Sequence, residues 1–135
     1  MADQTGNPGK KVYDLAERTA KFGEAVIAFA KLLARDPITL PLIKQIVRSG
    51  TSIGANYCEA DNAVSKKEFL HRIGICRKEA KETMYWFRMI AASDPSSKKR
   101  GRILWKEAKE LHLIFTAIWR KKIIPSNVIL SAEKN

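Results

Sequence analysis

Four stretches of this sequence place an apolar residue alternately every three and every four positions. A stripe with that spacing lies along one face of an α-helix and packs against neighbouring helices. The stripes run through residues Val12–Leu33, Ile43–Ala60, Phe69–Ile90 and Leu104–Ile118. Helices of about 20 to 28 residues joined by short loops predict an all-α fold, an antiparallel up-and-down four-helix bundle.

Helix-ending and helix-starting residues separate the four stripes. Pro37 predicts that the first helix ends near Arg35, because the residue before a proline avoids the helical region. Thr39 can cap the second helix, and Ser65 with Glu68 three residues later has the spacing of a capping box for the third. Residues 94–101 are expected to form a loop before the fourth helix. The bundle is predicted to span residues 12–124, after a disordered lead-in (1–11) and before a tail (125–135).

Gly50 and Gly54 lie inside the second stripe. Each costs a helix about 1 kcal/mol relative to alanine, so a helix that keeps both is expected to use them for close backbone approach. A helix-turn-helix with its turn near Gly50 is the competing interpretation. The apolar spacing continues through both glycines, which favours one helix.

The positive charge of the chain is concentrated in its second half. The 135 residues carry a net charge of +11. Residues 1–64 hold 8 Lys and Arg against 7 Asp and Glu, and residues 65–135 hold 17 against 7. Such a field attracts polyanions, although a lysine-rich solvated surface is the simpler alternative. No stretch reaches the roughly 20 apolar residues that span a bilayer, and two separate cysteines favour a reducing cytoplasm.

Residues for catalysis or metal binding do not form a recognisable pattern. A di-iron bundle needs two Glu-x-x-His motifs and two further glutamates, whereas Glu68-x-x-His71 occurs once. Neither His71 nor His112 has a nucleophile or carboxylate at a catalytic spacing, and Cys76 falls on a core stripe. No phosphate-binding glycine loop is present. We therefore expect no enzyme activity, no metal and no cofactor.

A polar stripe follows the apolar stripe of the second helix, with spacings of 3, 4, 4 and 3. It consists of Gln45, Arg48, Ser52, Asn56 and Glu59. Glu79 on the third helix is a plausible partner for Arg48. These residues either fix the register of the helices or contribute to a subunit contact or ligand site.

The segment Gln45–Ala60 resembles the second-helix signature of the bacterial "four helix bundle protein" family. The family includes proteins encoded within intervening sequences of large-subunit ribosomal RNA genes, and accessory variability determinants of retroelements share its fold. The signature residues Gln45, Arg48, Ser52, Asn56 and Glu59 are present, but Ala60 replaces the usual glycine and Ser49 departs from the pattern. The resemblance implies a homo-oligomer, typically a pentamer. In the retroelement branch it also implies a basic surface that engages nucleic acid and a reverse transcriptase.

The candidate nucleic-acid surface consists of Lys98, Lys99, Arg100, Arg102, Lys106 and Lys109 at the start of the fourth helix, Arg120, Lys121 and Lys122 at its end, and Lys78 and Lys81 on the third helix, to which Lys66, Lys67, Arg72 and Arg77 add charge. These spacings allow two patches. We expect binding by charge and shape, without reading of single-stranded bases, because no aromatic strand platform is predicted.

Aromatic residues form a second seam beside the core. Trp105, His112 and Trp119 are spaced by seven, and Trp86 directly precedes the core residue Phe87. The three tryptophans either broaden the core or form an oligomer interface. Two functions remain open, a nucleic-acid-binding oligomer that serves as an accessory to another enzyme, and a protein–protein adaptor that binds an acidic partner.

Overall fold

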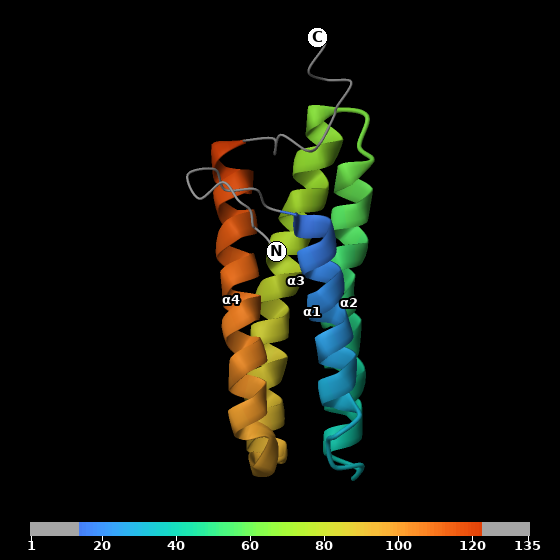
Figure 1. Ribbon diagram of the computed structural model, residues 1–135, viewed down its shortest axis with the longest axis vertical. Coiled ribbons are helices and arrows are strands. Elements are labelled where there is room, and N and C mark those ends of the chain that lie inside the picture. Colours follow the sequence, from blue (N-terminus) through green and yellow to red (C-terminus); the bar gives the residue numbers. More distant parts are fainter. Residues whose placement is uncertain (1–13, 123–135) are drawn as a thin grey trace, which may run out of the picture.

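The computed structural model describes residues 14–122, and four long helices occupy most of that range (Figure 1). The helices are α1 (Leu15–Ala30), α2 (Thr39–Asp61), α3 (Lys66–Ser93) and α4 (Lys98–Lys121), with a short 3-10 helix η1 (Pro95–Ser97) before α4. They run alternately up and down, each packs on the next in sequence, and α4 returns to α1. The predicted all-α up-and-down bundle is confirmed. The predicted lead-in (1–11) and tail (125–135) lie outside the described residues.

The predicted stripes form the buried core. All seven predicted positions on α3, from Phe69 to Ile90, are buried. The α2 stripe from Ile43 to Ala60 is buried as well. Aromatic pairs tie opposite helices together, since the ring centroids of Phe29 and Phe87 lie 5.4 Å apart. The apolar spacing therefore located the interior correctly.

Helix α1 ends at Ala30, earlier than the proline at position 37 predicted. The chain tightens there through backbone bonds of the 3-10 type, from Leu32 N to Phe29 O and from Leu33 N to Ala30 O. Leu33 nevertheless remains buried. The helix is 16 residues long, shorter than expected.

The start of α2 is capped by Asp36, not by Thr39 as predicted. The Asp36 carboxylate accepts hydrogen bonds from the backbone N–H of Thr39 (2.8 Å) and of Ile38 (3.0 Å). These bonds lower the pKa of Asp36 from its ordinary value, with the bond from Thr39 as the main cause. The cap of α3 is as predicted, because Ser65 Oγ accepts from Glu68 N at 3.1 Å.

The predicted break between the third and fourth helices is present, but it is shorter than the loop predicted at 94–101. Only Asp94 lies between α3 and η1, and α4 begins at Lys98. Gly101 is buried inside α4, where a Cβ would lie 3.3 Å from the Phe29 ring and 3.8 Å from the Phe87 ring. The glycine therefore lets two core rings approach α4.

Helix α2 is continuous through both of its glycines, so the helix-turn-helix interpretation is wrong. A Cβ on Gly50 would lie 3.0 Å from both γ-carbons of Val26, and a Cβ on Gly54 would lie 3.3 Å from the Thr19 hydroxyl. The two glycines allow α1 and α2 to approach closely, as their positions predicted.

Candidate functional site

The carboxylates of α3 and α4 are directed away from the groove between these two helices. On α3, Glu79 lies 3.3 Å from Arg48 of α2, and Glu82 pairs with the same guanidinium. On α4, Glu107 and Glu110 both pair with Arg18 of α1. Acidic side chains thus bind the two helices to the other half of the bundle.

The Arg18–Glu107 pair is bidentate. Arg18 Nε lies 2.8 Å from Glu107 Oε2, and Nη2 lies 2.9 Å from Oε1. The hydrogen bonds with Glu107 raise the pKa of Arg18 above its ordinary value. Two parallel charge-assisted bonds hold α1 and α4 in one register.

The polar stripe of α2 contacts α3. The predicted Arg48–Glu79 pair is confirmed, and Gln45 Oε1 accepts from Arg48 Nε at 3.1 Å. Asn56 accepts from Arg72 Nη1 at 3.0 Å and donates to Ser52. The contacts therefore favour a register-fixing role for most of the stripe.

Two stripe-related expectations change in the structure. Glu59 is exposed, and within residues 14–122 it forms no hydrogen bond or ion pair with α3. Arg72 faces α2 through Asn56, so it does not belong with the other cations of α3 in a common surface.

Cations line the side of α3 and α4 that lies opposite their paired carboxylates. Their spacings of four and seven on α3, and of four, four and three on α4, place them on one face of each helix. This basic face consists of Arg77, Lys81 and Arg88 on α3 and Lys98, Arg102, Lys106 and Lys109 on α4. Within residues 14–122 none of the seven forms an ion pair with a carboxylate, so no acidic side chain there neutralises their charge.

The remaining predicted cations lie around this face or at its far end. Arg100 is exposed and points away from it by helical register, whereas Lys78 and Lys99 are exposed three positions before Lys81 and Arg102 and therefore border it. Arg120, Lys121 and Lys122 are exposed at the C-terminal end of α4, where Lys122 has a left-handed φ of 55°. The two ends of α4 therefore carry separate clusters of charge.

The tryptophans divide between two grooves. Trp86 faces α2, where its Nε1 donates to Glu82 Oε2 at 2.8 Å. Trp105 and Trp119 lie on the α3 side of α4 with cations above their rings, Lys109 at 5.5 Å and Arg77 at 4.4 Å. The predicted single seam is therefore split, and an oligomer interface at these residues stays a prediction.

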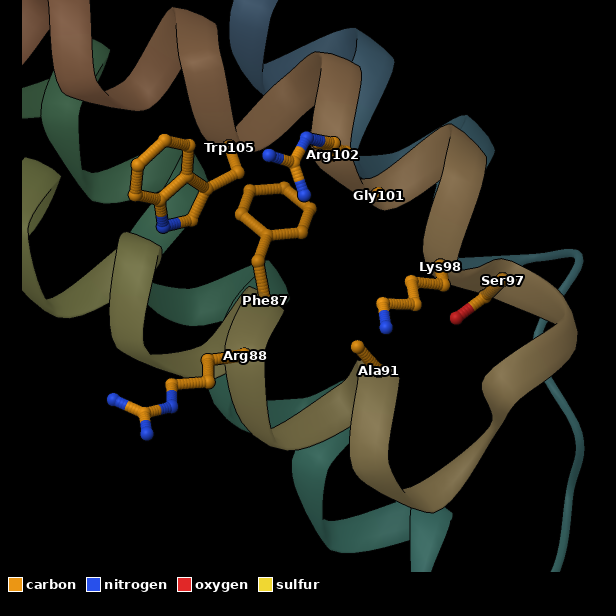
Figure 2. Close-up of a pocket in the computed structure, with 8 residues that line it drawn as sticks. All are labelled: Phe87, Arg88, Ala91, Ser97, Lys98, Gly101, Arg102 and Trp105. Carbon is orange, nitrogen blue, oxygen red and sulfur yellow. The ribbon is translucent and has the colours of Figure 1, made fainter.

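A pocket of about 320 Å³ opens at the η1 end of the basic face (Figure 2). Its lining residues are Phe87, Arg88, Ala91, Ser97, Lys98, Gly101, Arg102 and Trp105. Three members of the basic face thus surround an apolar interior. Sequence reasoning missed Arg88, although it follows Arg77 and Lys81 at helical spacing, and it placed Gly101 in a loop.

The other potentially reactive side chains, Cys76 and His112, contact the interior or the backbone of the bundle. Burial raises the pKa of the Cys76 thiol to about 12. His112 Nδ1 lies 3.1 Å from the Arg77 carbonyl oxygen. Within residues 14–122, no three His, Cys, Asp or Glu side chains gather as metal ligands would. Across the same residues, no helix has the length and apolar character needed to cross a membrane.

Comparisons with known proteins identify relatives. The family model described as 23S rRNA-intervening sequence protein matches residues 11–117. A crystal structure from Bacteroides thetaiotaomicron, of a protein with unknown function from the S23 ribosomal protein family, is 28% identical. The match covers 78% of this chain and 95% of that chain, with a TM-score of 0.71. No curated protein matches the chain.

Proposed function

The chain belongs to the 23S rRNA-intervening sequence protein family, and we propose that it is a non-enzymatic protein that binds structured RNA through its basic face. The observation that supports this most is the separation of charge on α3 and α4. The described carboxylates of these helices that form ion pairs do so with Arg18 and Arg48, whereas the basic face has no acidic partner there. A surface that only kept the protein soluble would not need such separation.

The geometry favours recognition of the phosphate backbone. The face is a row of lysines and arginines on two adjacent antiparallel helices, and it extends over several helical turns. Such cations neutralise phosphates and release counterions, which gives affinity with little dependence on sequence. RNA is the polyanion we favour, because the family takes its name from a ribosomal RNA intervening sequence.

The test is a binding titration against a structured RNA at several salt concentrations. The triple variant Lys81→Gln, Lys106→Gln, Lys109→Gln removes three cations of the basic face. Its matched control is Lys21→Gln, Arg35→Gln, Lys44→Gln, at exposed positions on α1, α2 and their connection. Each variant changes the net charge equally, from +11 to +8.

The two variants should differ in salt dependence. Losing three phosphate contacts makes the negative slope of log affinity against log salt less steep by about 2 to 3. Between 50 and 200 mM salt, the wild type should therefore lose roughly 20- to 40-fold more affinity than the face variant. The control should keep nearly the wild-type slope. Equal effects of both variants, or no binding at the lowest salt, would refute the proposal.

We further propose that the protein acts as a homo-oligomer, so that each basic face is repeated and weak contacts add. The resemblance of Gln45–Ala60 to its family signature favours a pentamer, and Trp119 is 39% exposed and available to a neighbour. Light scattering after size-exclusion chromatography tests this. A mass equal to that of one 15.2 kDa chain at all concentrations would contradict it.

A further inference from the structure

The pocket on the basic face combines an apolar interior with a rim of cations. Its interior is formed by Phe87, Trp105, Ala91 and the backbone at Gly101, and it is mostly apolar. Around it stand Arg88 from α3 and Lys98 and Arg102 from α4, and no acidic residue contributes to the lining. In Figure 2 the two aromatic rings lie next to each other across the α3–α4 interface.

The lining restricts the occupant to an anionic group that carries an apolar or aromatic part. A volume of about 320 Å³ is at the lower end of the range for small-ligand sites. It suits one planar ring system and excludes a helix or a strand. The three cations at the rim can contact phosphates on either side of such a group.

The position of the pocket favours a nucleotide over an acidic peptide. Lys98 and Arg102 belong to the same row as Lys106 and Lys109, so a phosphate backbone lying along the basic face passes the pocket mouth. A peptide with one acidic residue would satisfy the pocket but would leave most of this row without a partner. Aromatic side chains are also the usual surfaces on which unpaired RNA bases stack.

We propose that the pocket receives one unpaired nucleotide of the bound RNA, with its base against Trp105 and Phe87 and its flanking phosphates on Arg88, Lys98 and Arg102. The inference rests on the proposed function and adds the structural element that is recognised, a bulged or looped-out base. The lining presents few hydrogen-bonding groups besides the cations and Ser97, whose hydroxyl is already donated to Asp94 O at 2.7 Å. Recognition should therefore tolerate any base.

The experiment compares three RNA hairpins that differ at one position, a fully paired stem, a stem with one bulged uridine, and the same bulge with an abasic site. Each is titrated at one fixed salt concentration. The bulged hairpin should bind roughly 5- to 150-fold more tightly than the abasic one, the range found for stacking of one base on an aromatic side chain. The paired and abasic hairpins should bind alike.

Two pocket variants and one control variant assign the difference to the pocket. Trp105→Ala should abolish the preference for the base, whereas Trp119→Ala, at the other cation-covered tryptophan of α4, should retain it. Ala91→Leu fills the pocket without removing an aromatic ring and should also abolish the preference, which guards against misfolding of the first variant. Far-ultraviolet circular dichroism checks that all three remain helical.

The outcomes separate this inference from the function on which it depends. Salt-sensitive binding of all three hairpins with equal affinity would refute the pocket proposal and leave the basic face intact. Absence of binding to any hairpin would refute both. A third outcome is that the hairpins show no preference for the base, while a peptide with adjacent aspartate and phenylalanine binds at the pocket. This would assign the pocket to an acidic protein partner and overturn the proposal.

Discussion

Replacing Gly50 by alanine should destabilise the bundle although alanine is the better helix former. In a free helix the substitution gains about 1 kcal/mol. Here the new Cβ would lie 3.0 Å from both γ-carbons of Val26, a buried β-branched side chain that has little rotameric freedom. Overpacking of this kind costs about 1 to 3 kcal/mol, so the free energy of unfolding should fall by roughly 1 kcal/mol.

The Val26→Ala background should reverse the sign of this effect. Removing the two γ-carbons costs about 1.5 to 3 kcal/mol by itself, but it also removes the closest contacts of the added Cβ. What remains is the Val26 Cβ at 3.3 Å, a contact that a small shift relieves. Gly50→Ala should then stabilise the protein by up to about 1 kcal/mol, which corresponds to a coupling energy of roughly 2 kcal/mol.

Urea unfolding of the four proteins at one protein concentration measures this coupling. Gly23→Ala is the matched control on the same interface, because its Cβ would lie 3.6 Å from the nearest atom, Thr51 Cα. That variant should gain about 1 kcal/mol. Effects of Gly50→Ala and Val26→Ala that add to within about 0.5 kcal/mol would refute the close-packing explanation of the glycine.

Three further measurements test other parts of the structure. A thiol reagent at pH 8 should label only Cys58, which is exposed, until denaturant releases Cys76, whose pKa burial raises to about 12; labelling of both in the native protein would contradict this. Asp36 and Asp94 have lowered pKa values through hydrogen bonds, Asp36 mainly from Thr39 and Asp94 mainly from Ser96. Their contribution to stability is complete above the ordinary value of 3.8 and is lost as the pH falls through the lower folded values, so Asp36→Asn with Asp94→Asn should flatten the acid limb of a melting-temperature profile. Arg48→Ala should cost about 1 kcal/mol of stability without changing RNA affinity, and a selective loss of RNA binding would instead make the polar stripe part of the interface.

The fold could be predicted because burial imposes a helical period on the sequence. The buried positions of α3 from Phe69 to Ile90 coincide with the predicted stripe. Boundaries were predicted less well, because tertiary contacts decide them. Gly101 resembles a loop residue in the sequence, yet it lies inside α4 since Phe29 and Phe87 need the space that its missing side chain leaves.

The candidate site could be predicted only in part. Net charge indicated the half of the chain that carries the basic face, and the Arg48–Glu79 pair followed from helical spacing. The pocket could not be predicted, because Phe87 and Trp105 meet only when α3 and α4 pack in one register. Arg88 was missed for the same reason, since its significance depends on the residues opposite it.

The ion pairs that hold the bundle together also determine where its charge is exposed. Arg18 and Arg48 each bind two carboxylates from the strongly basic half of the chain. If those four glutamates lay on the basic face instead, they would neutralise four of its seven cations. The nearly neutral first half therefore holds these acidic side chains on its own side of the bundle. Loss of one such arginine, as in Arg48→Ala, leaves Glu79 and Glu82 on the side of α3 opposite the cations, because the helical register of α3 fixes their direction. This is why that variant should lose stability and keep its RNA affinity.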